Sequence, residues 1–166
     1  MLDQLGVTIV DARISQTGEG LNLDLYHVLE EDGTPLTDSD RQSEVEGAIL
    51  RALLGPDDTP RAVSRRAPRQ ARMFNTPVHI SVSEDERNGR SVLELTAGDR
   101  PGLLSDVAKV LMHEKIELRA AKIMTVGERA EDVFYVTDAD QRPLDAGSAQ
   151  RLKDSLAAAL DQRRAA

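Results

Sequence analysis

The sequence has no cysteine and no tryptophan, and aromatic residues make up only 2% of its 166 residues. The absence of cysteine excludes a disulfide framework, a thiolate metal site and a cysteine nucleophile. Because aromatic side chains are scarce while hydrophobic residues reach 40%, we expect an aliphatic core of Leu, Ile, Val and Ala. A chain of this length suits one ordinary domain or two small ones.

Long apolar runs are also missing. No run approaches the roughly 20 residues of a membrane span, and the N-terminus lacks a basic and then apolar signal pattern. The formal net charge is −8 at pH 7, which disfavours nonspecific binding to nucleic acids or anionic membranes. We therefore expect a cytoplasmic protein that binds neither nucleic acid nor membrane.

Motifs for catalysis or metal binding are not found either. Asp138-Ala139-Asp140 matches a metal-binding D-x-D, but it lies in a turn before Pro143, where Asp is favoured anyway. The histidines are His27, His79 and His113, which lie far apart in the sequence and have no adjacent Asp. The simplest interpretation is that each is a surface residue and not a metal ligand. No P-loop or G-x-G-x-x-G occurs. We expect no catalytic site, metal or cofactor in these residues.

The segment from Leu93 to His113 holds the most informative pattern, a strand, a turn and an amphipathic helix. Apolar and polar residues alternate from Leu93, as in a half-buried strand. Asp99 is placed to cap the following helix, with Pro101 in its first turn. One apolar stripe follows, made of Leu104, Val107, Ala108 and Leu111. Gly102 lacks a side chain at the helix N-terminus, so a carboxylate could bind there; a tight connection without a ligand is the alternative.

The chain contains one supersecondary unit twice. Residues 2–14 lie over residues 111–123, with Ala12-Arg13-Ile14 over Ala121-Lys122-Ile123. After a one-residue adjustment the alignment continues as Asp24 over Asp132, Tyr26 over Phe134, Val28 over Val136 and Pro35-Leu36 over Pro143-Leu144. The first copy opens at Met1, inside the end of its first helix. We therefore expect a chain that is the C-terminal part of something longer, or a gene model with a late start.

Turn signals and periodicity give the layout of the first copy, residues 1–54. It begins with a helix remnant at residues 1–5, followed by strands near residues 7–15 and 21–29. Its last helix spans residues 38–54, with one apolar face made of Val45, Ile49, Leu50 and Leu53. Residues 55–75 hold three Pro and five Arg and are expected to form a linker. A contact of these Arg residues with a phosphate is the alternative.

The second copy, residues 76–166, is preceded by an extra strand. Residues 78–82 alternate and are followed by Asn88-Gly89, a hairpin signal. The hairpin pairs this strand with residues 91–97. A βαββαβ sheet needs a fourth strand beside its first, and the hairpin strand supplies that edge. The expected fold is α+β, with two ferredoxin-like modules, of which the first lacks its N-terminal strand and most of its first helix.

With this order of elements and the D-R-P-G-L-L turn, the chain resembles a pair of ACT domains. Over residues 1–160 it is similar to the C-terminal region of the bifunctional PII uridylyltransferase/uridylyl-removing enzymes. The residues that carry this second resemblance are the segments 93–111 and 120–136, including the turn at residues 125–129 and Glu131-Asp132.

The resemblance implies regulation by a bound amino acid, glutamine in that family. ACT effectors sit where two domains meet, between the first turn of one domain and the second strand of its neighbour. Carried over to this chain, the site residues are Asp99, Arg100, Pro101, Gly102, Leu103, Ile116, Glu117 and Leu118. Backbone N–H groups of the turn would hold the carboxylate, and a group near Glu117 would take the amino group.

The implied partners are upstream catalytic domains, the PII protein indirectly, and a second copy of the chain through the sheet edges. Two other functions remain open. One is a structural or oligomerising ACT pair without an effector. The other is RNA binding, which needs aromatic residues on the sheet. The predicted strands offer few aromatic residues, namely Tyr26, Phe134 and Tyr135. The net charge of −8 also argues against RNA binding.

Overall fold

A computed structural model describes residues 5–17, 21–55 and 76–162. The predicted helix remnant at residues 1–5 and the predicted linker at residues 55–75 lie outside the described residues except for Leu5 and Gly55, and so does the turn expected at residues 18–20. The strands are β1 (Val7–Gln16), β2 (Asn22–Glu30), β3 (His79–Asp85), β4 (Arg90–Gly98), β5 (Glu117–Val126) and β6 (Arg129–Thr137). The helices are α1 (Ser39–Leu54), α2 (Leu103–His113) and α3 (Ala146–Gln162). The predicted α+β class is confirmed.

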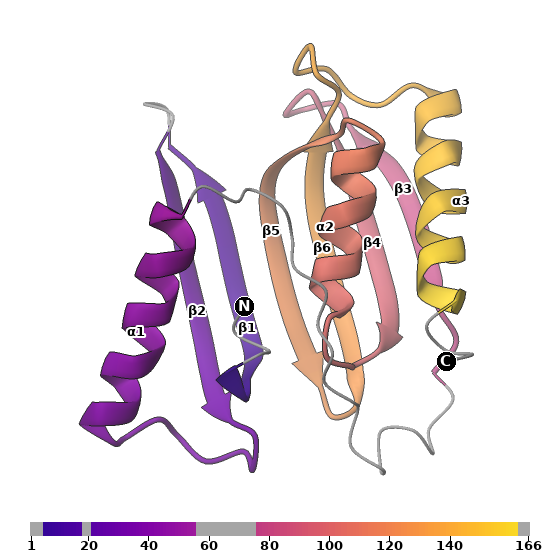
Figure 1. The fold of residues 1–166 in the computed structure, drawn as a ribbon. Helices are drawn as coiled ribbons and strands as arrows, with labels where there is room; N and C mark the ends of the chain where they lie inside the picture. The colour runs from indigo at the N-terminus through magenta and orange to yellow at the C-terminus, as the bar shows by residue number, and fades with distance from the viewer. Residues whose placement is uncertain (1–4, 18–20, 56–75, 163–166) are drawn as a thin grey trace.

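All six strands form one antiparallel sheet in the order β2-β1-β5-β6-β4-β3. Figure 1 shows the three helices on one side of this sheet. The predicted hairpin is confirmed, since β3 pairs with β4 from His79 opposite Thr96 to Asp85 opposite Arg90. Gly89 in its turn has φ +61°, a conformation that glycine adopts without steric cost. The hairpin strand therefore forms the edge beside β4.

The core lies between the helices and the sheet, and most of it belongs to the second copy. Alternate residues of β6 point into it, so Ala130, Phe134 and Val136 are buried while Glu131, Val133 and Tyr135 are partly exposed. From the helices, α3 contributes Leu152, Leu156 and Leu160, each at most 2% exposed. The buried apolar residues of the described first copy are Val7, Ala12 and Val45. The first copy thus has little core of its own.

The exposure of α1 corrects the predicted apolar face of that helix. Asp38, at which this helix was predicted to start, is its N-cap. The Asp38 side chain accepts a hydrogen bond from the Arg41 backbone N–H at 2.8 Å. Of the predicted face only Val45 is buried, whereas Leu50 is 50% and Leu53 75% exposed. The periodicity was sufficient to find the helix, but burial also needs a neighbouring element to pack against the face.

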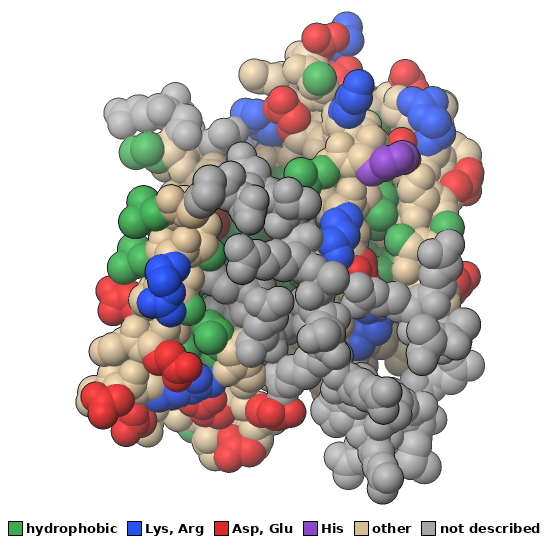
Figure 2. All heavy atoms as spheres, in the orientation of Figure 1, with side chains coloured by type: hydrophobic (Ala, Val, Ile, Leu, Met, Phe, Trp, Pro, Cys, Tyr) green, Lys and Arg blue, Asp and Glu red, His purple; other side chains and the backbone are tan. Residues whose placement is uncertain are grey.

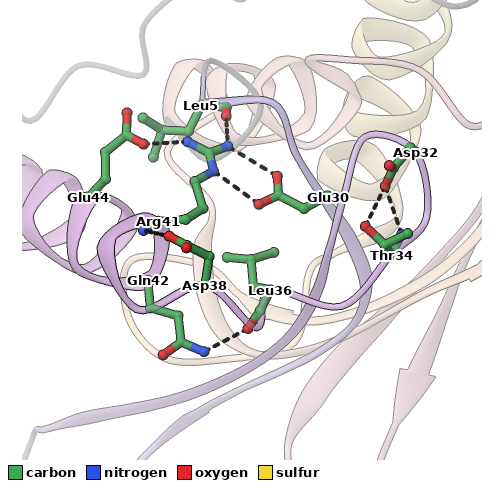
Figure 3. A network of polar contacts seen from close by, with 9 residues as sticks. All are labelled: Leu5, Glu30, Asp32, Thr34, Leu36, Asp38, Arg41, Gln42 and Glu44. Atoms are coloured by element: carbon green, nitrogen blue, oxygen red, sulfur yellow. Dashed lines mark hydrogen bonds and ion pairs between the residues drawn. The ribbon is translucent and has the colours of Figure 1, made fainter.

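Hydrogen bonds of Arg41 connect α1 to the strands of the first copy (Figure 3). Its guanidinium donates to both carboxylate oxygens of Glu30 on β2, at 3.0 and 3.2 Å. It also donates to Glu44 in the next helical turn at 2.6 Å and to the carbonyl oxygen of Leu5, just before β1. This two-oxygen contact with one carboxylate fixes direction as well as distance, so one side chain joins α1, β2 and the start of β1.

The two copies meet where β1 pairs antiparallel with β5, and the register of this seam is reciprocal. Ala12 lies opposite Ile123, and Ile14 lies opposite Ala121. In the repeat alignment Ala12 corresponds to Ala121 and Ile14 to Ile123, so each pair is the counterpart of the other. Arg13 and Lys122, which correspond to one another, lie directly opposite. A pseudo-two-fold axis therefore passes through the Arg13/Lys122 pair.

Candidate functional site

The turn between β4 and α2 is held by one backbone hydrogen bond to the neighbouring β5–β6 turn and by another within the turn itself. The Asp99 N–H donates to the Glu128 carbonyl at 2.8 Å, and the Leu103 N–H donates to the Arg100 carbonyl at 3.2 Å. Gly102 is buried and has φ +83°. Because L-residues rarely adopt this conformation, the glycine is what lets the chain turn directly into the helix.

The predicted position of the helix N-cap was wrong by three residues. The N-cap of α2 is Gly102, and the helix begins at Leu103, so both Asp99 and Pro101 precede the cap. The pattern D-x-P is compatible with a cap at Asp99 and a proline in the first turn of the helix. It could not show that Gly102 takes the left-handed conformation and delays the helix.

Arg100 points its guanidinium into the protein beside the first turn of α2. Its Nη1 donates to Asp106 Oδ2 at 3.0 Å, and the side chains of Arg100 and Asp106 are 18% and 8% exposed. Lys109 Nζ lies 3.8 Å from the other oxygen of Asp106. The second terminal nitrogen of Arg100, Nη2, is buried and has no hydrogen-bond partner. One guanidinium N–H group is thus left to donate.

Asp132 on β6 is the most deeply buried carboxyl group near this turn, at 2% exposure. Its Oδ1 accepts from the Met124 backbone N–H at 3.3 Å, while its Oδ2 has no partner. Burial raises the pKa of Asp132 to about 7, and the negative charge of Asp99 adds to this rise in pKa. Glu128 Oε2, in the adjoining turn, is also buried without a partner. An unpaired donor and two unpaired acceptors therefore lie at the same end of the sheet.

The sequence patterns placed Asp132 in the repeat alignment and in the family resemblance but did not identify it as a site residue. The signal was present, because Asp132 stands at an inward position of a strand whose other inward residues are Ala130, Phe134 and Val136. A carboxyl group in such a row is costly unless it has a partner or a function.

The predicted site residues fall into two groups that lie at opposite ends of the sheet. Gly98 and Val126 each lie opposite Arg129, which places the 99–103 turn at that end. Glu117 lies opposite Thr137, at the other end of β6. Within one chain, Ile116, Glu117 and Leu118 do not adjoin Asp99, Arg100, Pro101, Gly102 and Leu103. The assignment of an effector to these residues stays a prediction.

The first strand of the first copy, β1, does extend to the end of the sheet at which the 99–103 turn lies. Ile9, which aligns with Leu118, accepts a hydrogen bond at its carbonyl from Thr125 Oγ1 at 3.4 Å. The register of β1 with β5 runs from Ser15 opposite Ala120 to Asp11 opposite Met124, so the start of β1 extends toward the β5–β6 turn. The strand of the first copy that extends to this end of the sheet is therefore β1, beside the end of β5.

Within the described residues, no group of three His, Asp or Glu side chains is arranged to hold a metal ion. The D-x-D at residues 138–140 forms a turn in which Asp138 Oδ1 accepts from the backbone N–H groups of Asp140 and Arg142, at 2.9 and 2.8 Å. These bonds lower the pKa of Asp138, with that from Arg142 contributing most. No described helix is long and apolar enough to cross a membrane.

Known proteins resemble the chain along most of its length. Residues 91–153 match the ACT domain model. Curated proteins similar to the chain include the bifunctional uridylyltransferase/uridylyl-removing enzymes of Methylococcus capsulatus, 46% identical over 91% of this chain and 17% of the relative, and of Stutzerimonas stutzeri, 40% identical over 97% and 18%. The enzyme of the same name from Pseudomonas putida is 39% identical over 93% of this chain and 17% of its own length. The chain spans less than a fifth of the curated relatives it matches. No solved structure matches it.

Proposed function

Residues 91–153 belong to the ACT domain family, and from this we propose that the chain is a regulatory module that binds a free amino acid. We propose further that it contains two ACT modules, residues 1–54 and 76–166, joined by a linker. In this proposal the module belongs to a longer uridylyltransferase/uridylyl-removing enzyme and signals to its catalytic domains, with the PII protein as an indirect partner and no resident cofactor.

The set of buried, unpaired polar atoms at the 99–103 turn carries the proposal. An amino acid zwitterion presents one carboxylate and one ammonium group. Arg100 Nη2 is a donor that matches the carboxylate, and Asp132 Oδ2 is an acceptor that matches the ammonium group. Buried polar atoms are nearly always paired in native proteins, and bonds to charged groups are the stronger ones. We propose that one zwitterion pairs with both atoms.

The end of the sheet at which the turn lies supports a regulatory role, because the start of β1 reaches the same end. In this proposal a ligand at residues 99–103 contacts the second copy and extends toward the start of β1 in the first copy. Binding would then favour one relative orientation of the two copies over others. Coupling free energies of this kind are typically about 1 to 3 kcal/mol, enough to change the activity of attached domains several-fold.

We propose glutamine as the effector, with calorimetric titration of the folded chain as the test. Saturable heat with glutamine, and none with glutamate or alanine, is the expected result. Asp132→Asn should weaken binding at least about tenfold, because it replaces the carboxylate that would pair with the ammonium group. Asp24→Asn, at the aligned exposed position of the first copy, is the matched control and should bind as the unmodified chain does. No heat with any amino acid would reject the sensor in favour of a structural ACT pair.

A further inference from the structure

We propose that Glu128 determines which amino acid the 99–103 turn accepts, by pairing with a side-chain N–H donor and excluding a side-chain carboxylate. The inference rests on the proposed function, because it assigns the third buried and unpaired atom of that site to the side chain of the ligand. The class of ligand that follows is an amino acid with a terminal amide, of the length of glutamine. Glutamate carries a carboxylate in place of that amide and is the ligand that Glu128 excludes.

The first observation is that Glu128 has an acceptor atom without a partner. Its Oε2 is buried and accepts no hydrogen bond. Many other acidic side chains face solvent, among them Asp38, Asp40 and Glu44, which are exposed. Figure 2 shows red acidic side chains of this kind over α1, at the lower left of the molecule. A solvated carboxylate bonds to water, whereas a buried acceptor without a donor is costly. The atom that Glu128 Oε2 needs is therefore an N–H group.

The two arginines next to Glu128 in the fold do not supply this group. Arg129, the following residue, pairs with Glu131. Arg100, in the turn to which Glu128 is bonded, pairs with Asp106 at 3.0 Å. Arg100 Nη2 and Glu128 Oε2 are both without a partner, so they do not bond to one another. They consequently call for two different groups, an acceptor for Arg100 and a donor for Glu128.

The separation of Glu128 from Asp132 along the chain fits a ligand of the length of glutamine. The Asp99 N–H donates to the Glu128 carbonyl at 2.8 Å, which places Glu128 beside the turn. Asp132 is four residues further on, along β6, and four residues of extended strand span roughly 13 Å. An extended glutamine is roughly 6 Å long between its two nitrogen atoms, and a hydrogen bond at each end adds about 3 Å. Alanine has no group that could reach the second carboxylate.

Charge then separates glutamine from glutamate. The amide of glutamine donates N–H groups and has no net charge, so its bond to the Glu128 carboxylate is charge-assisted. The side chain of glutamate would bring a second carboxylate to a buried one, where like charges disfavour each other. A site that hydrogen-bonds an N–H group of its ligand strongly rejects the analogue without it, because the buried group of the site is left unpaired.

The test is calorimetric titration of the original chain and of Glu128→Gln with glutamine and with glutamate. The amide of Glu128→Gln keeps the shape of the carboxylate, accepts from glutamine through its oxygen and donates to glutamate through its nitrogen. The affinity for glutamine should stay within about threefold, while the ratio of the glutamine to the glutamate affinity falls at least about tenfold. A gain of glutamate binding requires an intact site, so a merely structural role of Glu128 would not produce it.

Two further variants complete the experiment. Glu94→Gln makes the same change of charge at an exposed position of β4 and should keep the original preference for glutamine. Glu128→Ala removes both the acceptor and the repulsion, so it should bind the two ligands weakly and with similar affinity. Urea denaturation establishes that each variant is folded.

The inference is overturned, with the proposed function intact, by any of three results. They are equal binding of glutamine and glutamate by the original chain, a full preference for glutamine in both Glu128 variants, and a folded Glu128→Gln that binds neither ligand. Absence of heat with every amino acid, in the original chain as well, rejects the proposed function and the role of Glu128 together.

Discussion

Gly102 takes a backbone conformation that other residues adopt only with strain, so its replacement should act through the backbone. At φ +83°, an L-side chain costs about 1 to 2 kcal/mol. Gly102→Ala should lower the free energy of unfolding by that amount and weaken amino acid binding, since it displaces the 99–103 turn. Urea denaturation and calorimetric titration measure the two effects.

Gly33 provides a matched control for this substitution. It has the same φ of +83°, and an added Cβ there would meet no atom within 4 Å. Gly33→Ala should therefore show a similar loss of stability with unchanged binding. If both variants bind equally well, the turn is not part of the amino acid site.

The pKa of Asp132 predicts how stability depends on pH. Its ordinary value of 3.8 rises to about 7 in the folded protein because of burial. Between these values the folded state binds more protons than the unfolded state, so stability falls as pH rises from about 4 to about 7. Urea unfolding at pH 5 and pH 8 should show this loss, on the order of a few kcal/mol.

Asp132→Asn should remove this dependence and make the variant more stable than the original chain at pH 8. Asp24→Asn is again the control, because the aligned aspartate is exposed. Parallel stability profiles for the original chain and Asp132→Asn would show that Asp132 does not titrate in this range.

At the scale of elements, α1 and α3 occupy equivalent places but should differ in what they contribute. Leu160→Ala removes a side chain that is 2% exposed and should cost about 2 to 4 kcal/mol. Leu53→Ala, at the aligned position that is 75% exposed, should stay within about 0.5 kcal/mol. Urea denaturation of both variants tests this, and equal losses would mean that Leu53 is covered in solution.

Local pattern was enough to predict most elements from the sequence. Alternation and turn residues gave β1, β2 and β4 within a residue or two and β3 within three residues, because each strand is bounded by Gly, Asn, Asp or Pro. The repeat predicted where α1 and α3 lie, and the apolar stripe after the 99–103 turn predicted α2. Exposure could not be predicted this way, since Leu53 and Leu160 look alike in sequence and differ only in their neighbours. The candidate site was predicted in part, because Arg100 and Gly102 are contiguous, whereas the nearness of Asp132 depends on the pairing of β4 with β6.

For the whole molecule, the unequal distribution of core residues predicts unequal local stability. The described first copy buries Val7, Ala12 and Val45, and the remaining buried apolar residues lie between Leu93 and Leu160. Regions with few buried apolar contacts open at lower free energy. Native-state hydrogen exchange should therefore be faster in β1, β2 and α1 than in β4, β6 and α3. Uniform exchange would indicate one cooperative unit.

The pairing of β1 with β5 links the two copies and should control the difference in their hydrogen-exchange rates. Ala12 is 1% exposed and lies opposite Ile123. Ala12→Asp places a carboxyl group in the core, at a cost of several kcal/mol. It should speed exchange throughout residues 7–54 while β4 and β6 remain protected. Ser15→Asp, at an exposed position of the same strand, should have little effect.

The reciprocal register about Arg13 and Lys122 also affects which amino-acid substitutions this protein can accept. In a dimer of identical chains, a substitution at a position that pairs across the axis enters the interface twice, so its cost or gain is doubled. Here the two sides are encoded separately, and the same substitution enters once. Arg13 and Lys122 have already diverged, as have Tyr26 and Phe134. One half of the molecule can therefore keep a full core while the other half adapts its surface independently.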